Sequence, residues 1–177
     1  MGAAMTSSSF QPFEQRIEHV TGNHPDSPRS EIILSRLFFH VFKRFNESQN
    51  IHLSAFGLNS TSWLALIMMH ATPGNALNPC ELSEAMISSR TNITRLADEL
   101  VEKGWVERSA SGEDRRKVVL SLTDAGRDLV ESVLPHQWQY YREMWSCFSP
   151  GEIATFEALM RKLLDRLDAS GSPSCQS

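Results

Sequence analysis

The sequence predicts a mainly α-helical fold that carries one β-hairpin. Apolar side chains recur at helical spacing over most of the 177 residues, and capping residues, prolines and glycines mark where helices start and stop. The exception is a pair of strand-like runs, residues 105–108 and 117–122, which flank a polar turn at residues 109–116. A short helix, a turn, a longer helix and then a hairpin together make a winged helix-turn-helix.

Three helices are predicted before the helix-turn-helix, over about residues 13–21, 30–57 and 60–71. The first two carry an apolar side chain every three or four residues, and the third begins at a cluster of hydroxyl residues and is stopped by Pro73. The apolar stripe of residues 30–57 is wide for a lone surface helix, which indicates a buried or intersubunit position.

Residues 78–104 carry the signals of two consecutive helices. Asn78 is a good N-cap, Pro79 suits the first helical position, and Glu81 stands where a capping box needs it. The next helix is expected over about residues 88–103, and the glycine that follows suits a left-handed helix end.

Two more helices are expected after the hairpin. The first covers about residues 124–148 and contains Pro135, which predicts a kink or a break. The second starts at the capping pattern of residues 149–152. The small and polar residues 1–11 and 169–177 have little to bury, so we expect both ends to be disordered.

Composition argues against several classes of protein. The chain is 41% hydrophobic and 21% charged, which suits one soluble domain with a core. It contains no apolar run of about eighteen residues and begins unlike a signal peptide, so we expect a cytoplasmic protein without a membrane partner. Three scattered cysteines predict no disulfide framework, and six histidines show no paired spacing for a metal ion. There is no phosphate-binding glycine loop or nucleophile elbow, so we expect no enzyme, no catalytic residues and no cofactor.

The helix over residues 88–103 has a face that suits DNA. Its apolar positions 93, 96, 97 and 100 form one stripe, and the opposite face carries hydroxyl, amide and arginine groups with no acid before Asp98. Short polar groups can approach base edges, while arginine reaches guanine or phosphate. The alternative is an ordinary amphipathic helix with a polar start. The expected DNA-contacting residues are Ser88, Ser89, Arg90, Thr91, Asn92, Thr94 and Arg95.

The hairpin turn is the second candidate for DNA contact. Arginine suits the strong negative potential of a narrow minor groove. Asp114 can pair with Arg116 and leave Arg115 to project, with Lys117 beside them. The alternative is a solvated turn with compensating charges. The net charge of -4 gives no sign of a nucleic-acid partner, so the local placement of the cations decides.

Several motifs together resemble the MarR family of bacterial regulators. They are LS at 82–83, RTNITRL at 90–96, LVEKGWVER at 100–108 and DRRKVVLSLTDAG at 114–126, and the resemblance spans nearly all of residues 30–168. Residues 90–92, 134–135 and 161–167 look closest to the multidrug-efflux regulators of that family. The resemblance implies a homodimeric repressor of a pseudo-palindromic operator, with residues 88–103 in the major groove and the tip at Arg115 in the minor groove. It also implies release of the DNA by a small aromatic or phenolic effector.

A dimer is also favoured by the residues themselves. Two reading heads on a two-fold axis meet successive major grooves about 34 Å apart, whereas one head makes too few base contacts for specificity. The apolar first and last helices supply hydrophobic surface for such a dimer. We therefore expect disordered ends at 1–11 and 169–177, dimerisation helices at 12–57 and 124–168, and a DNA-binding lobe at 58–123.

The resemblance places the effector between the dimerisation helices and the DNA-binding lobe. In this chain that crevice is expected to involve Arg36, His40, Trp63, Met69 and His70. An aromatic wall, a flexible methionine and cationic or titratable groups suit an aromatic carboxylate. The alternative is that Trp63 and Met69 belong to the core and that the two histidines are satisfied polar groups.

Cys80 offers an alternative, thiol-based mode of regulation. It stands in the first turn of a predicted helix, where the helix dipole favours a reactive thiolate. The competing interpretation is a small packing cysteine, since no second cysteine or neighbouring cation is evident in the sequence.

Overall fold

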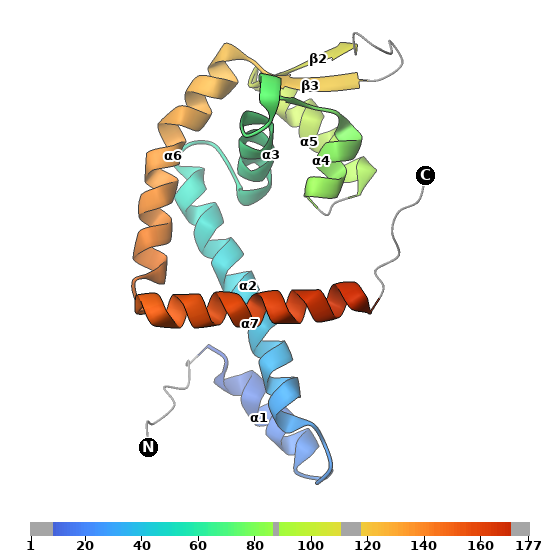
Figure 1. Cartoon of the computed structure of the whole chain (residues 1–177), viewed down its shortest axis with the longest axis vertical. Helices are drawn as coiled ribbons and strands as arrows, with labels where there is room; N and C mark the ends of the chain where they lie inside the picture. Colours follow the sequence, from blue (N-terminus) through green and yellow to red (C-terminus); the bar gives the residue numbers. More distant parts are fainter. Residues whose placement is uncertain (1–8, 87–88, 111–117, 171–177) are drawn as a thin grey trace. The chain divides into compact units, whose positions relative to one another are not determined.

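The computed structural model describes residues 9–86, 89–110 and 118–170 (Figure 1). The chain divides into two compact units, residues 1–130 and residues 131–177. The first unit holds two N-terminal helices and the helix-turn-helix with its sheet, and the second holds most of the long helix α6 and all of α7.

The N-terminal helices α1 (Gln11–Thr21) and α2 (Arg29–Ser54) pack against each other. The ring of Phe10 is buried and lies 5.6 Å, centroid to centroid, from the ring of His40 on α2. The expectation of disorder up to residue 11 is therefore wrong at its end, because this aromatic side chain has a partner that is distant in the sequence. At the other end of α2, Asn46 and Asn50 bind Ser60, each at 2.7 Å, and so attach the helix to α3.

Three helices follow α2: first α3 (Ser60–His70), and then α4 (Pro79–Ala85) and α5 (Arg90–Glu102), which together form the helix-turn-helix. The predicted N-cap at Asn78 is confirmed: its side-chain oxygen accepts hydrogen bonds from the backbone N–H groups of Cys80 and Glu81, both at 2.9 Å. Gly104 follows the C-cap of α5, and its φ of 72° is the left-handed conformation that glycine adopts most easily. The chain can therefore turn directly from α5 into the sheet.

The sheet contains one strand more than the two predicted. It consists of β1 (Ala76–Leu77), β2 (Val106–Ala110) and β3 (Val118–Leu122), which are antiparallel in the order β1-β3-β2. Strand β1 follows a 3₁₀ turn at Pro73–Asn75 and has only two residues. It is too short to show alternation, so the expectation of a two-stranded wing is corrected to a three-stranded sheet with β3 in the middle.

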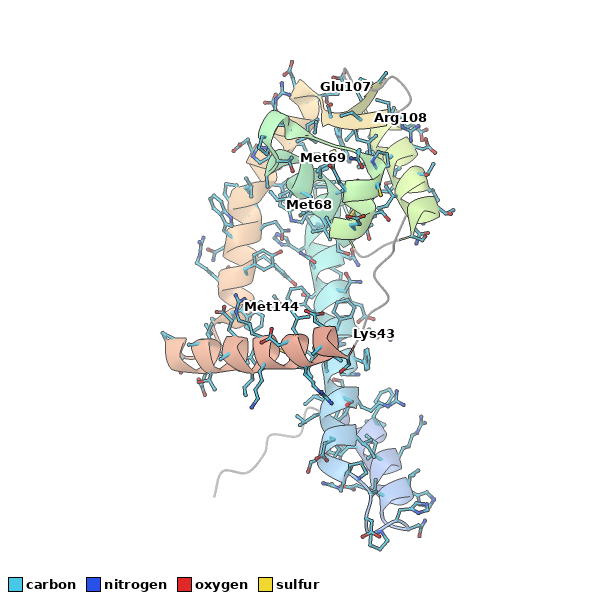
Figure 2. The ribbon with its side chains drawn as sticks, turned by 45° about the vertical axis from the view of Figure 1, so that its right-hand side comes forward. Lys43, Met68, Met69, Glu107, Arg108 and Met144 are labelled. Carbon is cyan, nitrogen blue, oxygen red and sulfur yellow. The ribbon has the colours of Figure 1, made fainter. Side chains whose placement is uncertain are left out.

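The core of the first unit lies between these helices and the sheet. The predicted stripe of α5 is confirmed, because Ile93, Leu96, Ala97 and Leu100 are all buried. Other buried side chains of the first unit come from α2, α3, α4, β2 and β3 and include Leu53, Leu66, Met69, Leu82, Val106, Leu120 and Leu122. Figure 2 shows Met69 inside the lobe. The stripe orients α5 because burying its apolar side turns the polar side outward.

Helix α6 (Asp124–Trp145) begins where the sheet ends. The N–H of Thr123 donates to the carbonyl of Trp105 at 3.1 Å, and its hydroxyl donates to the carbonyl of Gly104 at 2.7 Å. The same hydroxyl oxygen accepts the N–H of Gly126 at 3.0 Å, which caps the helix. This junction fixes the start of α6 against the strand that follows α5.

The second unit contains the rest of α6 and α7 (Pro150–Ala169). Of the predicted kink or break at Pro135, the break does not occur, because α6 continues through this residue. The capping box at the start of α7 is confirmed, with Ser149 as the N-cap and Glu152 as its partner. Helix α7 includes Ala169, the first residue of the expected tail, so that boundary moves by one residue. None of the described helices is both long and apolar enough to span a membrane.

Candidate nucleic-acid interface

The outward face of α5 carries the residues predicted to contact DNA. Thr91, Asn92, Thr94 and Arg95 are exposed, opposite the buried stripe. The hydroxyl of Ser89 accepts the N–H of Asn92 at 3.3 Å, so this serine acts as the N-cap of the helix. Ser88 and the side chain of Arg90 lie outside the described residues. The described part of the face therefore offers hydroxyl, amide and guanidinium groups to a partner.

The predicted contacts at the tip of the hairpin, Asp114, Arg115, Arg116 and Lys117, lie outside the described residues. The strands that support the tip are described, and β2 pairs with β3 from Val106 opposite Leu122 to Ala110 opposite Val118. The register is continuous over five pairs, so Ala110 and Val118, the described residues on either side of the tip, lie opposite each other.

Arg108 on β2 was missed by the sequence reasoning. Its Nη1 lies 2.6 Å from Oδ1 of Asp98 on α5, and its Nη2 donates to the carbonyl of Thr94 at 3.5 Å. Figure 2 shows Arg108 on the sheet beside α5. The pair ties the wing to the candidate recognition helix and neutralises the acid on its exposed face. The sequence indicated this pair only indirectly. A strand that turns back immediately after a helix must pass the last turns of that helix, so side chains of the strand can reach side chains of the helix.

A polar hollow of about 250 Å³ lies beside the exposed face of α5. It is lined from the α5 side by Asn92, Arg95 and Glu99 and from the start of α3 by Asn59 and Thr61. Asn59 caps α3 by accepting the N–H of Ser62 at 2.8 Å. The start of α3 thus extends the polar surface beyond α5, which the sequence analysis did not foresee because the two segments are about thirty residues apart.

The five predicted effector residues fall into two groups. Trp63 is 5% exposed and Met69 is 0% exposed, as the core interpretation of these residues requires, and His70 is half-buried on the same helix. Arg36 and His40 instead lie beside α1: the ring of His40 contacts Phe10 and Phe13, and Arg36 lines a hollow between α1 and α2. An effector site formed by all five stays a prediction.

Cys80 is exposed in the first turn of α4, and its Sγ lies 3.7 Å from Oε1 of Glu84. Thiol-based regulation through this residue stays a prediction. Cys147 is exposed as well, with its Sγ 3.7 Å from the carbonyl of Met144. Across the described ranges, no three His, Cys, Asp or Glu side chains gather where they could hold a metal ion.

Comparisons with known proteins agree with this geometry. Residues 58–118 match the model of the MarR family. Over 161 residues the chain is 43% identical to the transcriptional repressor MprA of Escherichia coli strain K12, a match that covers 91% of this chain and 92% of that protein. The chain belongs to the MarR family. The segment that matches the family model lies within the predicted lobe at residues 58–123.

Solved MarR-family structures show the same fold. A mutant of E. coli MarR complexed with operator DNA superposes with a TM-score of 0.70 at 28% identity, covering 78% of this chain and 99% of that one. AbsC, a MarR-family transcriptional regulator from Streptomyces coelicolor, superposes with a TM-score of 0.73 at 18% identity, covering 79% of this chain and 95% of that one. The predicted MarR-type winged helix-turn-helix fold is confirmed.

Proposed function

We propose that this MarR-family protein is a transcriptional repressor that binds double-stranded DNA through α5 and the wing. The observation that carries the proposal is the outward face of α5. Thr91, Asn92 and Arg95 are exposed on this face, and the apolar side chains on the opposite face are buried in the core. These groups suit base edges and phosphates. The pairing of Arg108 with Asp98 supports it further, because it removes the charge that would repel phosphate. MprA is named a transcriptional repressor, and E. coli MarR has been solved with operator DNA.

We assign the wing tip, with Arg115 at its centre, to the minor groove beside α5. The ladder of β2 and β3 pairs Ala110 with Val118, the described residues that flank the segment, and Arg108 joins that sheet to α5. An arginine in a narrow minor groove gains from the concentrated negative potential there. Asp114, Arg116 and Lys117 are proposed to hold and orient the tip.

The protein is proposed to act as a homodimer on a pseudo-palindromic operator. Helix α7 buries none of its residues, although it carries large apolar side chains along much of its length. The exposed ones are Ile153, Phe156, Leu159, Leu163, Leu164 and Leu167. Helix α2 likewise exposes Phe39 and Phe42. A second copy that covers these apolar side chains supplies the missing burial and sets two copies of α5 on one DNA duplex. The N- and C-terminal helices, residues 12–57 and 124–168, are thereby assigned to dimerisation.

A small aromatic or phenolic effector is proposed to release the DNA. Such a ligand acts by binding more tightly to a form of the dimer in which the spacing of the two α5 helices no longer fits successive major grooves. If adding an aromatic acid at constant ionic strength leaves the affinity for the operator unchanged, that class of effector is excluded. A protein that works in this way acts where the chromosome is, in the cytoplasm.

The proposed function is tested with DNA selected in vitro from a random pool. Fluorescence anisotropy then compares selected and random duplexes at several salt concentrations, and binding is expected to fall steeply as salt rises. Replacing Thr91 or Arg95 by alanine is expected to change the preferred base pairs, at a cost of about 1–3 kcal/mol for each specific contact. Replacing Arg115 is expected to weaken binding to every sequence and to reduce the salt slope.

The control variant is Arg161→Ala on α7, where the arginine pairs with Glu157 of its own helix at 2.7 Å. It removes the same charge at a distance in sequence from the lobe, and it is expected to leave sequence preference unchanged. If all four variants lose the same affinity for selected and random DNA, the assignment of α5 to base recognition is wrong. If the unaltered protein binds no duplex even at low salt, the proposed function itself fails.

A further inference from the structure

Lys103 ends α5 and contacts the segments on both sides of that helix. It is the C-cap residue of α5, and its Nζ lies 2.8 Å from Oε1 of Glu99, one turn earlier in the helix. The same Nζ donates to the carbonyl of Gly57 at 3.3 Å and lies 4.8 Å from the centre of the Trp105 ring. The ammonium group therefore joins α5 to the turn after α2 and to the residue that precedes β2.

The turn at Gly57 offers a carbonyl group that suits a cation. The N–H of Gly57 donates to the carbonyl of Ser54 at 3.0 Å, and the N–H of Leu58 donates to the carbonyl of Leu53 at 3.2 Å, so these bonds close the end of α2. The C-terminal end of a helix carries partial negative charge, and a lysine beside it is stabilised. In this lobe the lysine at the end of α2 comes from a different helix, α5.

Lys103 differs from an ordinary surface lysine of this chain. Lys43 on α2 also pairs with a glutamate four residues away, Glu47, but their N–O distance is 3.8 Å and the lysine side chain is 72% exposed. The side chain of Lys103 is 36% exposed. An exposed ion pair within one helix contributes little by itself. An ammonium group that also contacts an indole ring and a distant carbonyl is held in one place.

Helix α5 is thereby anchored at two places, on two different elements. Arg108 of β2 contacts Asp98 and the carbonyl of Thr94, and Lys103 holds the end of the helix to Gly57. A helix with one anchor can pivot about it, whereas two separate anchors oppose both pivoting and sliding. Base recognition needs such a fixed helix, because hydrogen bonds to base edges tolerate only small changes in length and angle.

We infer that Lys103 is a positioning residue for base recognition, which docks the end of α5 on the turn after α2 through the Gly57 carbonyl and the Trp105 ring. This role rests on the proposed function of α5 in DNA binding. Lys103 stands twelve residues after Thr91, about 18 Å further along the helix axis, so it acts through the helix and not on the bases. Its loss is expected to disturb contacts to base pairs more than the sequence-independent attraction to phosphates.

The test is Lys103→Met, which keeps the aliphatic stem and removes the ammonium group. Fluorescence anisotropy compares the duplex selected in vitro with a random duplex, at a temperature where circular dichroism shows every variant to be folded. The affinity of Lys103→Met for the selected duplex is expected to fall about fivefold, and its affinity for the random duplex by less than about twofold. Lys103→Arg is expected to stay within about twofold of the unaltered protein, because arginine also donates to carbonyls and packs on indole rings.

Two control variants separate docking from the loss of charge. Lys162→Met removes the same charge from an exposed position of α7, which is not one of the apolar side chains assigned to the dimer contact. It is expected to leave the ratio of the two affinities unchanged. Glu99→Gln in the Lys103→Met background removes the carboxylate that Lys103 neutralises, and this double variant is expected to remain as weak as Lys103→Met.

A measurement without DNA tests the docking contact itself. In protein labelled with 5-fluorotryptophan, the ¹⁹F NMR signal of Trp105 is identified by its absence in Trp105→Phe. This signal is expected to shift in Lys103→Met, because the ammonium group leaves the ring, and to stay in place in Lys162→Met.

Three binding results overturn the inference. The first is a Lys103→Met variant that binds both duplexes as Lys162→Met does. The second is an equal loss on selected and random DNA, which would make Lys103 a phosphate contact. The third is recovery of affinity on adding Glu99→Gln, which would make its role the neutralisation of that acid. An unchanged Trp105 signal in Lys103→Met overturns the docking contact whether or not the protein binds DNA, so the two proposals can fail separately.

Discussion

Gly126 offers the sharpest test of how the DNA-binding lobe is joined to α6. This residue stands in the first turn of the helix, against the backbone that leads out of α5. A Cβ atom at position 126 meets the carbonyl oxygen of Trp105 at 2.0 Å and its carbonyl carbon at 2.9 Å. Because both neighbours are backbone atoms, no side-chain rotation can relieve the overlap. We therefore expect Gly126→Ala to destabilise the protein.

The size of the effect follows from the geometry. Ordinary van der Waals contact begins at 3.4 Å, so the helix and the Trp105 backbone must separate by about 1.4 Å. Overpacking of this kind costs about 1–3 kcal/mol. The movement also weakens the two hydrogen bonds that Thr123 donates to Trp105 and Gly104, at about 1 kcal/mol each. The better helix propensity of alanine returns up to about 1 kcal/mol. The expected net loss is about 2–4 kcal/mol.

Urea denaturation followed by circular dichroism measures this loss. With a slope of about 2 kcal/mol per molar urea, the midpoint of Gly126→Ala is expected to fall by about 1–2 M. Gly151→Ala is the matched control: Gly151 also stands in the first turn of a helix, but a Cβ atom there meets no atom within 4 Å. That variant is expected to be as stable as the unaltered protein or slightly more stable. If Gly126→Ala behaves like Gly151→Ala, the close approach of α6 to Trp105 is refuted.

Three further predictions concern side-chain interactions. Asn78→Ala is expected to lower the unfolding free energy by about 1 kcal/mol in urea titrations, because the N–H groups at the start of α4 lose their acceptor. Asn78→Asp is expected to keep most of this stability, because aspartate also accepts these hydrogen bonds. Arg108→Ala is expected to change stability by less than about 1 kcal/mol, since Arg108 and Asp98 are 39% and 59% exposed. Arg108→Ala is also expected to weaken operator binding in anisotropy titrations. Adding Asp98→Asn to this variant is expected to restore part of the lost affinity, because the side chain at position 98 is then neutral. Hydrogen bonds from the backbone N–H and then the hydroxyl of Ser149 lower the pKa of Glu152 below its ordinary value of 4.5. The contribution of Glu152 to stability is therefore complete above its unfolded pKa and is lost as the pH falls through its folded pKa. In Ser149→Ala, NMR titration is expected to show a higher pKa for Glu152 than in the unaltered protein.

Each of these predictions has a contradicting result. An unchanged urea midpoint for Asn78→Ala would mean that solvent satisfies the start of α4 equally well. An Asp98→Asn change that restores nothing in the Arg108→Ala background would mean that Arg108 does not act by neutralising the acid. A titration of Glu152 at its ordinary pKa in the unaltered protein would exclude the capping interaction as the cause of any acid sensitivity of α7.

Most of the fold could be predicted from short stretches of sequence. Helical periodicity and helix caps each follow from a single physical cause that acts within a few residues. The stripe of Ile93, Leu96 and Leu100 follows from helical periodicity alone, and it fixed which face of α5 is exposed. The caps at Asn78 and Ser149 follow from the need of the first N–H groups of a helix for acceptors. None of these depends on a residue far away in the chain.

The differences between prediction and structure arise from interactions that are distant in sequence. Phe10 stands among small and polar residues, and only its packing against His40 shows why it is ordered. The contact of Arg108 with Asp98 depends on how the chain turns at Gly104. Pro135 does not break α6, although proline costs about 3 kcal/mol inside a helix. Val133 on the same helix is fully buried, and burial of this kind offsets such a cost.

Helix α2 is a long, continuous helix that contacts α1 near its start and α3 near its end. It has 26 residues and is therefore about 39 Å long. Its beginning forms one wall of the hollow beside α1, and its end holds α3 through the two asparagine amides. If the helix pivots near its start by about 5°, its far end travels about 3 Å, a displacement comparable to the rise of one base pair, 3.4 Å. A change in the angle between α1 and α2 would thus be magnified at the opposite end of the rod, where α3 is attached.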